Sequence, residues 1–437
     1  MTTPIEHLYQ LFLNCSQKIS TDTRQLEKGS IFFSLKGDHF NANEFAHKAI
    51  EGGCFYAIVD EELIANGTTI LYVHNVLETL QQLAKHHRNQ LKISVIGITG
   101  SNGKTTNKEL IYAVLSKKYK TYATKGNLNN HIGVPITLLS IKPFHEIAII
   151  EMGANHQGEI ELLSTISNPD YGLITNIGKA HLEGFGGEEG VKKGKSELYK
   201  YIKQKNGKLF LNADDPLLVE LSDGIEKITY GLKEGNDVHG VLIKNSEFVE
   251  FKWNTKHQPI ENNTIIKTHL FGHYNFVNVL CAACIGNYFE VSIKDINEAL
   301  EEYIPEMNRS QVKKTNNNTL ILDAYNANPS SMQLAIDHFI KQSFPSKLFI
   351  LGDMLELGDY SKIEHEKILK QLTNNQIQEA ILVGPLFYEH KINFQDYHFF
   401  ENGNEAINYL TQNKPLNTTI LIKGSRGIKL EILIPNL

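Results

Sequence analysis

The sequence is poor in cysteine, in long apolar runs and in excess charge of either sign. Its 437 residues include four cysteines, too few and too scattered for a disulfide framework. No apolar run approaches the roughly 20 residues that a membrane-spanning helix needs. Lys and Arg total 43 against 49 Asp and Glu, a formal net charge of −6, which gives no electrostatic basis for binding nucleic acid or an anionic membrane. What remains is the composition of an ordinary globular protein.

The first residues also lack the pattern of a signal peptide. Residues 1–15 carry acidic and polar side chains where a signal peptide has a basic start and an apolar core. We therefore expect a cytoplasmic protein. Its length is too great for one hydrophobic core, so two to four domains are expected.

Apolar segments alternate with helical patterns along most of the chain. This order predicts an α/β protein of three domains: a small α/β domain over residues 1–90, a central domain with a mostly parallel sheet over 91–304, and a C-terminal Rossmann-like domain over 305–437. A polar stretch over 235–268 predicts a β-rich flap on the central sheet. The predicted strands are 31–35, 55–59, 69–73, 93–98, 120–123, 147–152, 172–175, 209–212, 320–323, 348–351, 380–383, 398–400 and 419–423.

A glycine-rich turn follows the first strand of the central domain. Residues 100–103 (Gly-Ser-Asn-Gly) are followed by Lys104, Thr105 and Thr106, and a helical pattern begins at Asn107. A strand, a glycine-rich turn and a helix form a phosphate-binding loop, in which Lys104 would reach the outer phosphates and Thr105 would suit Mg²⁺. The strict motif has glycine where this chain has Ile98. A tight turn with a solvated Lys104 is the alternative.

Three further polar residues of the central domain have a structural and a functional interpretation. Glu151 ends an apolar strand, where a carboxylate either binds a metal or caps the following turn. His181 follows another strand and either ligates a metal or forms an ordinary hydrogen bond. Lys195 lies in a charged helical segment, and its surroundings in the sequence favour solvent.

In the N-terminal domain, the polar residues 20–24 also have two interpretations. Arg24 could hold a phosphate through both of its terminal nitrogens. Alternatively, Asp22 caps a turn and Arg24 is solvated, and the residues alone favour this second interpretation.

Taken together, the motifs resemble the Mur ligase family, the ATP-dependent amide-forming enzymes of peptidoglycan precursor synthesis. The resemblance covers nearly the whole chain, and the family's own phosphate loop accounts for the displaced first glycine. The matching segments are Thr99–Thr105, Asn127–Pro135, Glu151–Asn155 and Asn176–His181.

Two C-terminal segments, Asp323–Met332 and Leu351–Gly358, are similar to one branch of that family. This branch adds D-alanyl-D-alanine to a UDP-N-acetylmuramoyl-tripeptide through an acyl phosphate and a tetrahedral intermediate, giving the pentapeptide, ADP and phosphate. The sequence leaves the third residue of the tripeptide open between lysine and diaminopimelate. Alternatives are another ligase of the superfamily, such as a folylpolyglutamate synthase, a P-loop NTPase switch, and a non-catalytic nucleotide-binding module.

The resemblance also implies the cofactors ATP and Mg²⁺, small-molecule partners, and a monomer whose C-terminal domain closes over the nucleotide. Lys104, Glu151, His181 and Lys195 would be catalytic. Thr105 and Glu151 would bind one Mg²⁺, and His181 and a CO₂-carboxylated Lys195 would serve a second. ATP would be held by Gly100, Ser101, Asn102, Gly103, Lys104, Thr105, Thr106, Asn275, Arg309 and Asp323. The substrates would be held by Ser20, Thr21, Asp22, Thr23, Arg24, Asn127, Asn129, Asn130, His131, Asn326 and Asn328.

Overall fold

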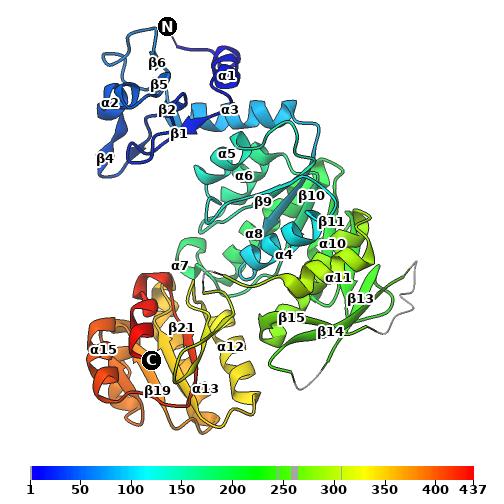
Figure 1. Ribbon diagram of the computed structural model, residues 1–437, viewed down its shortest axis with the longest axis vertical. Helices are drawn as coiled ribbons and strands as arrows, with labels where there is room; N and C mark the ends of the chain where they lie inside the picture. The colour runs from blue at the N-terminus through cyan, green and yellow to red at the C-terminus, as the bar shows by residue number, and fades with distance from the viewer. Residues whose placement is uncertain (1, 244–245, 257–263, 307) are drawn as a thin grey trace.

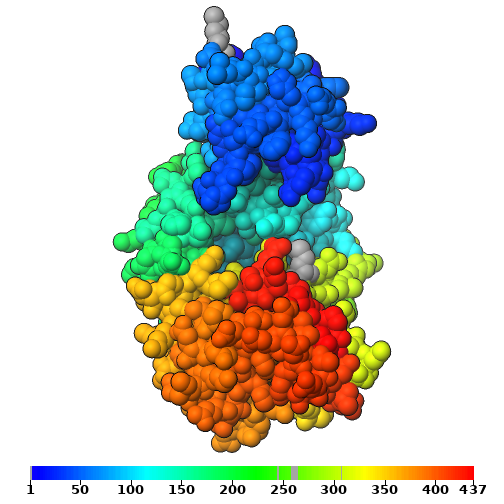
Figure 2. Space-filling model, turned by 90° about the vertical axis from the view of Figure 1, so that its left-hand side faces the viewer, coloured from blue at the N-terminus to red at the C-terminus, as the bar shows by residue number. Residues whose placement is uncertain are grey.

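Three α/β domains follow one another along the long axis of the molecule. The computed structural model describes residues 2–243, 246–256, 264–306 and 308–437. The N-terminal domain lies at one end, the C-terminal domain at the other, and the central domain joins them (Figure 1). Figure 2 shows the same succession from a second direction. Within the described residues, every helix is either too short or too polar to cross a membrane.

The N-terminal domain is built on a four-stranded parallel sheet of order β1-β2-β5-β6. Its last helix, α3, begins where the Asn75 side chain accepts a hydrogen bond from the Glu78 backbone N–H, and it packs against α5 and α6 of the central domain. The elements are α1 (Ile5–Asn14), β1 (Ile19–Ser20), β2 (Ile31–Phe33), β3 (Lys36–Gly37), β4 (Phe40–Asn41), η1 (Ala42–Phe45), α2 (Ala46–Glu51), β5 (Tyr56–Val59), β6 (Ile70–Tyr72) and α3 (Val76–Gln90).

The central domain contains a nine-stranded sheet of order β15-β14-β13-β12-β11-β10-β7-β9-β8. The predicted flap is the antiparallel end of this sheet, β13 to β15; residues 244–245 and 257–263 of the predicted stretch lie outside the described residues. The elements are β7 (Ser94–Thr99), α4 (Lys104–Leu115), β8 (Thr121–Ala123), α5 (Gly133–Leu139), β9 (Ile147–Glu151), α6 (Glu159–Ser167), β10 (Tyr171–Ile174), α7 (Leu182–Phe185), α8 (Glu188–Gln204), β11 (Lys208–Asn212), α9 (Pro216–Leu221), β12 (Glu226–Gly231), β13 (Val238–Leu242), β14 (Phe248–Thr255), β15 (Ile266–Phe271), η2 (His273–Asn275), α10 (Phe276–Tyr288) and α11 (Ile293–Glu302).

The C-terminal domain has a six-stranded sheet of order β16-β17-β21-β18-β19-β20, parallel except for β16. Helices alternate with its parallel strands. The elements are β16 (Gln311–Lys314), β17 (Thr319–Leu322), α12 (Pro329–Lys341), β18 (Lys347–Gly352), η3 (Gly358–Tyr360), α13 (Ser361–Asn374), β19 (Ala380–Val383), α14 (Pro385–Tyr388), η4 (Lys391–Asn393), β20 (His398–Phe400), α15 (Gly403–Gln412), β21 (Thr419–Lys423), η5 (Arg426–Ile428) and η6 (Leu430–Asn436).

Strand β7 shows why the apolar runs form a sheet that is covered on both faces. Val95 packs in the same cluster as residues of α6 and α8, whereas Ile96 and Ile98 pack in a cluster with α4 and α10. Alternate residues of a strand point to opposite faces, so a strand buried on both sides must be apolar throughout. The strand predictions are confirmed in both large sheets, and the all-parallel centre brings the carboxyl ends of β7, β9 and β10 to one edge.

One boundary near the phosphate loop differs from the prediction. Helix α4 begins at Lys104, three residues before the predicted start at Asn107. Gly103 is the residue before the helix and has a left-handed backbone with φ of 76°, which glycine adopts without steric cost. Lys104, Thr105 and Thr106 therefore lie in the first turn of the helix, where backbone N–H groups are free to bind an anion.

Candidate active site

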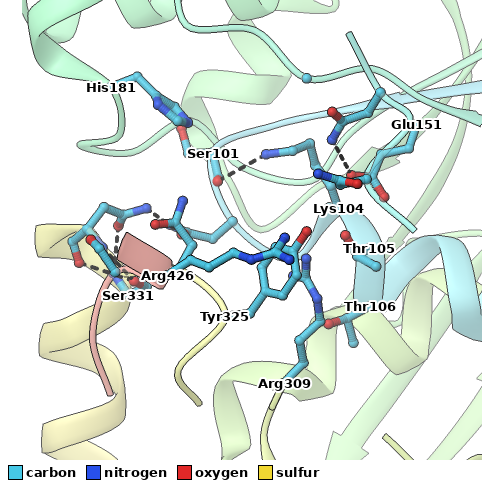
Figure 3. Close-up of a pocket in the computed structure, with 18 of the residues that line it drawn as sticks. Ser101, Lys104, Thr105, Thr106, Glu151, His181, Arg309, Tyr325, Ser331 and Arg426 are labelled. Atoms are coloured by element: carbon cyan, nitrogen blue, oxygen red, sulfur yellow. Dashed lines mark hydrogen bonds between the residues drawn. The ribbon is translucent and has the colours of Figure 1, made fainter. Parts of the chain in front are cut away.

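One cavity of about 810 Å³ lies where the central and C-terminal domains meet. It is lined by the loops that follow strands of both sheets, as expected for parallel α/β folds. Figure 3 shows side chains of the phosphate loop and of the C-terminal domain on opposite sides of this pocket. The predicted site residues that line it are Ser101, Asn102, Gly103, Lys104, Thr105, Thr106, Asn127, Asn129, Asn130, His131, Glu151, His181, Asn275, Arg309, Asp323, Asn326 and Asn328.

The glycine-rich loop is held in place by the segment after β10. Gly100 has φ of 140°, and a Cβ atom there would lie 2.0 Å from Oγ1 of Thr175. That hydroxyl donates a hydrogen bond to the Asn102 carbonyl at 2.6 Å, and the Ser101 hydroxyl donates to the Gly178 carbonyl at 3.0 Å. The close approach of the two segments explains why the first glycine of the loop is at position 100 in this chain.

Lys104 is folded against its own loop rather than extended into solvent. Its Nζ donates hydrogen bonds to the carbonyl oxygens of Gly100 at 2.6 Å and Ser101 at 3.3 Å. Burial lowers the pKa of the Lys104 amine, an effect that the carboxylate of Glu151 opposes and the cation of Arg309 reinforces. The structure therefore does not match the alternative interpretation, in which Lys104 is solvated.

Glu151 is a buried carboxylate with one oxygen available. Asn129 donates a hydrogen bond from Nδ2 to its Oε1 at 2.8 Å, and Nζ of Lys108 lies 3.9 Å from its Oε2. Oε2 accepts no hydrogen bond from any described residue. A buried carboxylate oxygen without a partner is unfavourable, and Mg²⁺ prefers hard oxygen ligands. Glu151 and the nearby hydroxyl of Thr105, which is also buried, therefore fit the chemistry of a magnesium site.

No set of three or more His, Cys, Asp or Glu side chains converges on a point that could hold a metal within the described parts of the chain. A magnesium ion at Glu151 would therefore take most of its ligands from hydroxyl groups, substrate phosphates and water.

The position of Lys195 contradicts the interpretation drawn from its local sequence. Its side chain, in α8, is completely buried, lies 5.0 Å above the Phe185 ring, and donates a hydrogen bond from Nζ to the Ala154 carbonyl at 3.0 Å. No described carboxylate forms an ion pair with it. Burial holds its pKa well below the usual range, and the cation of Lys104 lowers it further. Lys195 does not line the cavity itself but lies directly behind Ala154, which does.

The central and C-terminal domains exchange ionic contacts at the rim of the cavity. His181, immediately before α7, contacts Glu356 of the C-terminal domain, with Nδ1 and Oε2 2.5 Å apart. Both residues have left-handed backbones, with φ of 52° and 63°, a conformation that is uncommon for residues other than glycine. Beside them, Nζ of Lys179 lies 3.1 Å from Oε1 of the buried Glu364 of α13. These pairs connect the two domains at the rim of the cavity.

The far end of the cavity combines amide and aromatic groups. Asn275 donates hydrogen bonds from Nδ2 to the Phe271 carbonyl at 2.8 Å and to Oγ of Ser310 at 3.1 Å. The guanidinium of Arg309 stacks on the Tyr325 ring, 3.6 Å from its centroid. Oδ2 of Asp323 lies 2.6 Å from Nζ of Lys423, a residue that was not among the predicted site residues.

The predicted substrate residues 20–24 lie in the N-terminal domain and do not line this cavity. Ser20 is buried and shares a hydrogen bond with Ser30. Arg24 forms an exposed ion pair with Asp22 at 2.6 Å, and its hydrogen bonds lower the pKa of Asp22 to about 2. This geometry matches the structural interpretation of the segment, and its binding of substrate stays a prediction.

Sequence reasoning left several pocket residues without an assignment, among them Tyr325, Glu356 and Arg426. Each follows a strand of the C-terminal sheet, within a polar cluster that the sequence does reveal. The missing information was the docking of the C-terminal domain on the phosphate loop, which the sequence does not give residue by residue.

Comparison with known proteins identifies the family. The family model described as "Mur ligase middle domain" matches residues 98–286, and the model described as "Mur ligase, glutamate ligase domain" matches residues 308–426. A Bacillus subtilis protein named UDP-N-acetylmuramoyl-tripeptide--D-alanyl-D-alanine ligase is 35% identical over 432 residues, covering 96% of this chain and 92% of its own. The chain belongs to the Mur ligase family.

Solved structures agree with this membership. MurF from Acinetobacter baumannii matches this Mur ligase with a TM-score of 0.87 and 31% identity over 98% of both chains. MurF from Thermotoga maritima, solved in complex with ADP, matches with a TM-score of 0.84 and 25% identity over 97% of both chains. A folylpolyglutamate synthase from Mycobacterium tuberculosis shares the fold alone, at 12% identity and a TM-score of 0.61.

Proposed function

We propose that this Mur ligase joins D-alanyl-D-alanine to a UDP-N-acetylmuramoyl-tripeptide with conversion of ATP to ADP and phosphate, a step of peptidoglycan synthesis. One observation carries the proposal: the phosphate loop and the C-terminal loops line a single cavity, so that nucleotide, acid and amine can meet there. The full-length likeness to relatives named for this activity supports the choice of substrates.

The reaction needs an activated acid. Transfer of the γ-phosphoryl group of ATP to the tripeptide carboxylate gives an acyl phosphate, which the amine of the dipeptide attacks to form a tetrahedral adduct that expels phosphate. Lys104 and the N–H groups of the first turn of α4 supply positive charge where the transferring phosphoryl group is most negative. Arg309, Asp323 and Asn275 would hold the nucleoside from the opposite side of the cavity.

Magnesium would supply further charge neutralisation at the phosphates. Glu151 and Thr105 would hold one ion, because the free Oε2 of Glu151 and the Thr105 hydroxyl are hard oxygen donors beside the loop. His181 would contribute to a second site.

Carboxylation of Lys195 would complete that second site. Burial lowers the pKa of the Lys195 amine, and no described carboxylate forms an ion pair with it. Both conditions favour the neutral amine, which is the form that attacks CO₂. The new C–N bond to CO₂ and the loss of one proton convert the neutral amine into an anionic carbamate, whose oxygens can serve as ligands.

We further propose the domain boundaries 1–90, 91–304 and 305–437, a monomer, and a cytoplasmic location where ATP is supplied. Residues 20–24 and the amides Asn127, Asn129 and Asn130 would bind the UDP-linked precursor, and Asn326 and Asn328 the incoming amine.

The test is ADP release by the purified protein with UDP-N-acetylmuramoyl-tripeptide, with and without D-alanyl-D-alanine. We expect release that requires both substrates and yields the pentapeptide by mass spectrometry. Nucleotide hydrolysis without an amine acceptor would support an NTPase switch instead, and turnover with folates in place of the muramoyl precursor would support a folylpolyglutamate synthase.

A further inference from the structure

Arg426 is a charged pocket residue with no charged partner. It follows β21, and its guanidinium lies over the Tyr325 ring, 5.4 Å from the centroid, extending toward the middle of the cavity (Figure 3). Among the described residues it forms neither an ion pair nor a hydrogen bond through its side chain. The neighbouring charges of the C-terminal domain are paired, Lys423 with Asp323 and Glu356 with His181.

The residue before it fixes the position of Arg426. Ser425 is buried; its N–H donates to the Asp353 carbonyl at 3.0 Å, and its hydroxyl accepts from the Leu355 N–H at 3.0 Å and donates to the Ala327 carbonyl at 3.3 Å. One serine thus ties together the loops that follow β17, β18 and β21. Three hydrogen bonds of Ser425 therefore fix the chain next to Arg426, and the Arg426 side chain extends from this junction into the cavity.

The same junction places an anionic group on the adjacent loop. Glu356 follows Leu355, the residue that donates to Ser425, so Glu356 and Arg426 each lie one residue beyond a shared hydrogen bond. They do not pair with each other. Because Glu356 is engaged by His181, Arg426 is the charged group of this junction that remains available to a ligand.

We propose that Arg426 binds the free carboxylate of the incoming dipeptide. This inference rests on the proposed function. In that proposal the ATP phosphates face Lys104 of the central domain, whereas the dipeptide lies against the C-terminal loop of Asn326 and Asn328. Its terminal carboxylate is therefore an anion on the side of the cavity that carries Arg426. The planar guanidinium matches a carboxylate through two parallel hydrogen bonds. Once the carboxylate is held at Arg426, the amine end of the dipeptide is free to reach the acyl phosphate formed beside Lys104.

The experiment compares two acceptors, D-alanyl-D-alanine and D-alanyl-D-alaninamide, in the wild-type protein and in Arg426→Ala, with ATP and UDP-N-acetylmuramoyl-tripeptide at saturation. For the wild-type protein we expect a KM for the amide about 10- to 100-fold above that for the acid, because the charge-assisted contact is lost. Arg426→Ala should raise the KM for the acid by a similar factor and lose the discrimination between the two acceptors. Arg426→Lys keeps the charge but not the two parallel hydrogen bonds. Its KM for the acid should therefore lie between those of the wild-type protein and Arg426→Ala.

A matched control is Lys391→Ala, because Lys391 also lies over a tyrosine, Tyr388, in the C-terminal domain but outside the cavity. It should leave both KM values unchanged. Undiminished discrimination in Arg426→Ala, or a rise in the KM for ATP in place of the acceptor, would overturn the inference; the second result would assign Arg426 to a phosphate. Failure of the wild-type protein to use D-alanyl-D-alanine at all would instead refute the proposed function.

Discussion

Asn328 donates a hydrogen bond from Nδ2 to Oδ1 of Asn102 at 2.7 Å, so the C-terminal domain contacts the phosphate loop directly. Asn328 is also the N-cap of α12, where its Oδ1 accepts from the Ser331 N–H at 3.0 Å. One side chain therefore both begins a helix and links that helix to the loop that would hold ATP.

These two roles can be separated by substitution. Serine is a good N-cap but cannot reach Asn102, so Asn328→Ser should keep the stability of the domain and lower kcat/KM about 3- to 10-fold, the value of one hydrogen bond between the domains. Asn328→Ala should lose the same activity and also about 1 kcal/mol of stability through the missing cap. Steady-state kinetics and thermal melting measure the two effects. Equal stability loss in both variants would contradict the separation.

Lys104 should be required for turnover but not for folding. Lys104→Ala removes the cation beside the phosphate loop, and we expect kcat to fall at least about 10²-fold because that charge acts where negative charge develops in the transition state. Its hydrogen bonds are to carbonyls of its own loop, so the circular dichroism spectrum should not change. A near-normal rate of ADP release would remove the loop from the reaction.

Lys195 should be replaceable by an added acid. In Lys195→Ala the anionic ligand proposed at this position is lost, and we expect activity to fall and then to recover in part when formate or acetate is supplied, since a short carboxylate can occupy the space left. The control is Lys193→Ala, two residues away on the exposed side of the same helix, which should keep its activity and be insensitive to acetate. Wild-type activity that survives removal of CO₂, together with no recovery of the variant, would argue against a carboxylated lysine.

The sheets of this protein were predictable because their signal is local. β7 and β9 are apolar, β-branched runs that end at glycine or a carboxylate, and each was found where the pattern indicated. The same holds for Lys104 and Thr105, because the loop motif is contiguous. Strand β12 was not predicted, because four of its six residues are polar or glycine. It forms a strand by pairing with β11.

The burial of Lys195 could not be predicted from its immediate sequence neighbours. Its neighbours Lys192 and Lys193 suggest a charged helix face, yet Lys195 shares a helical stripe with Val191, Leu198 and Ile202, all of which are buried. A search by helical spacing could have found it. The pairing of His181 with Glu356 had no comparable signal, because it depends on how two separately folded sheets dock.

Gly100 should tolerate no side chain. Its φ of 140° is rarely adopted by other residues, and a Cβ would lie 2.0 Å from Oγ1 and 3.0 Å from the backbone nitrogen of Thr175. Thr175 cannot rotate away without breaking its hydrogen bond to the Asn102 carbonyl. Gly100→Ala should therefore displace the phosphate loop and raise the KM for ATP at least about 10-fold, since the loop N–H groups would no longer converge.

Gly67→Ala is the matched control. Gly67 also has a positive φ, 73°, but there is open space around the position of a Cβ. This variant should therefore lose a little stability and keep its affinity for ATP. Steady-state kinetics at varied ATP concentration and thermal melting of both variants make the comparison. An unchanged KM for ATP in Gly100→Ala would contradict the role of the loop in binding phosphate.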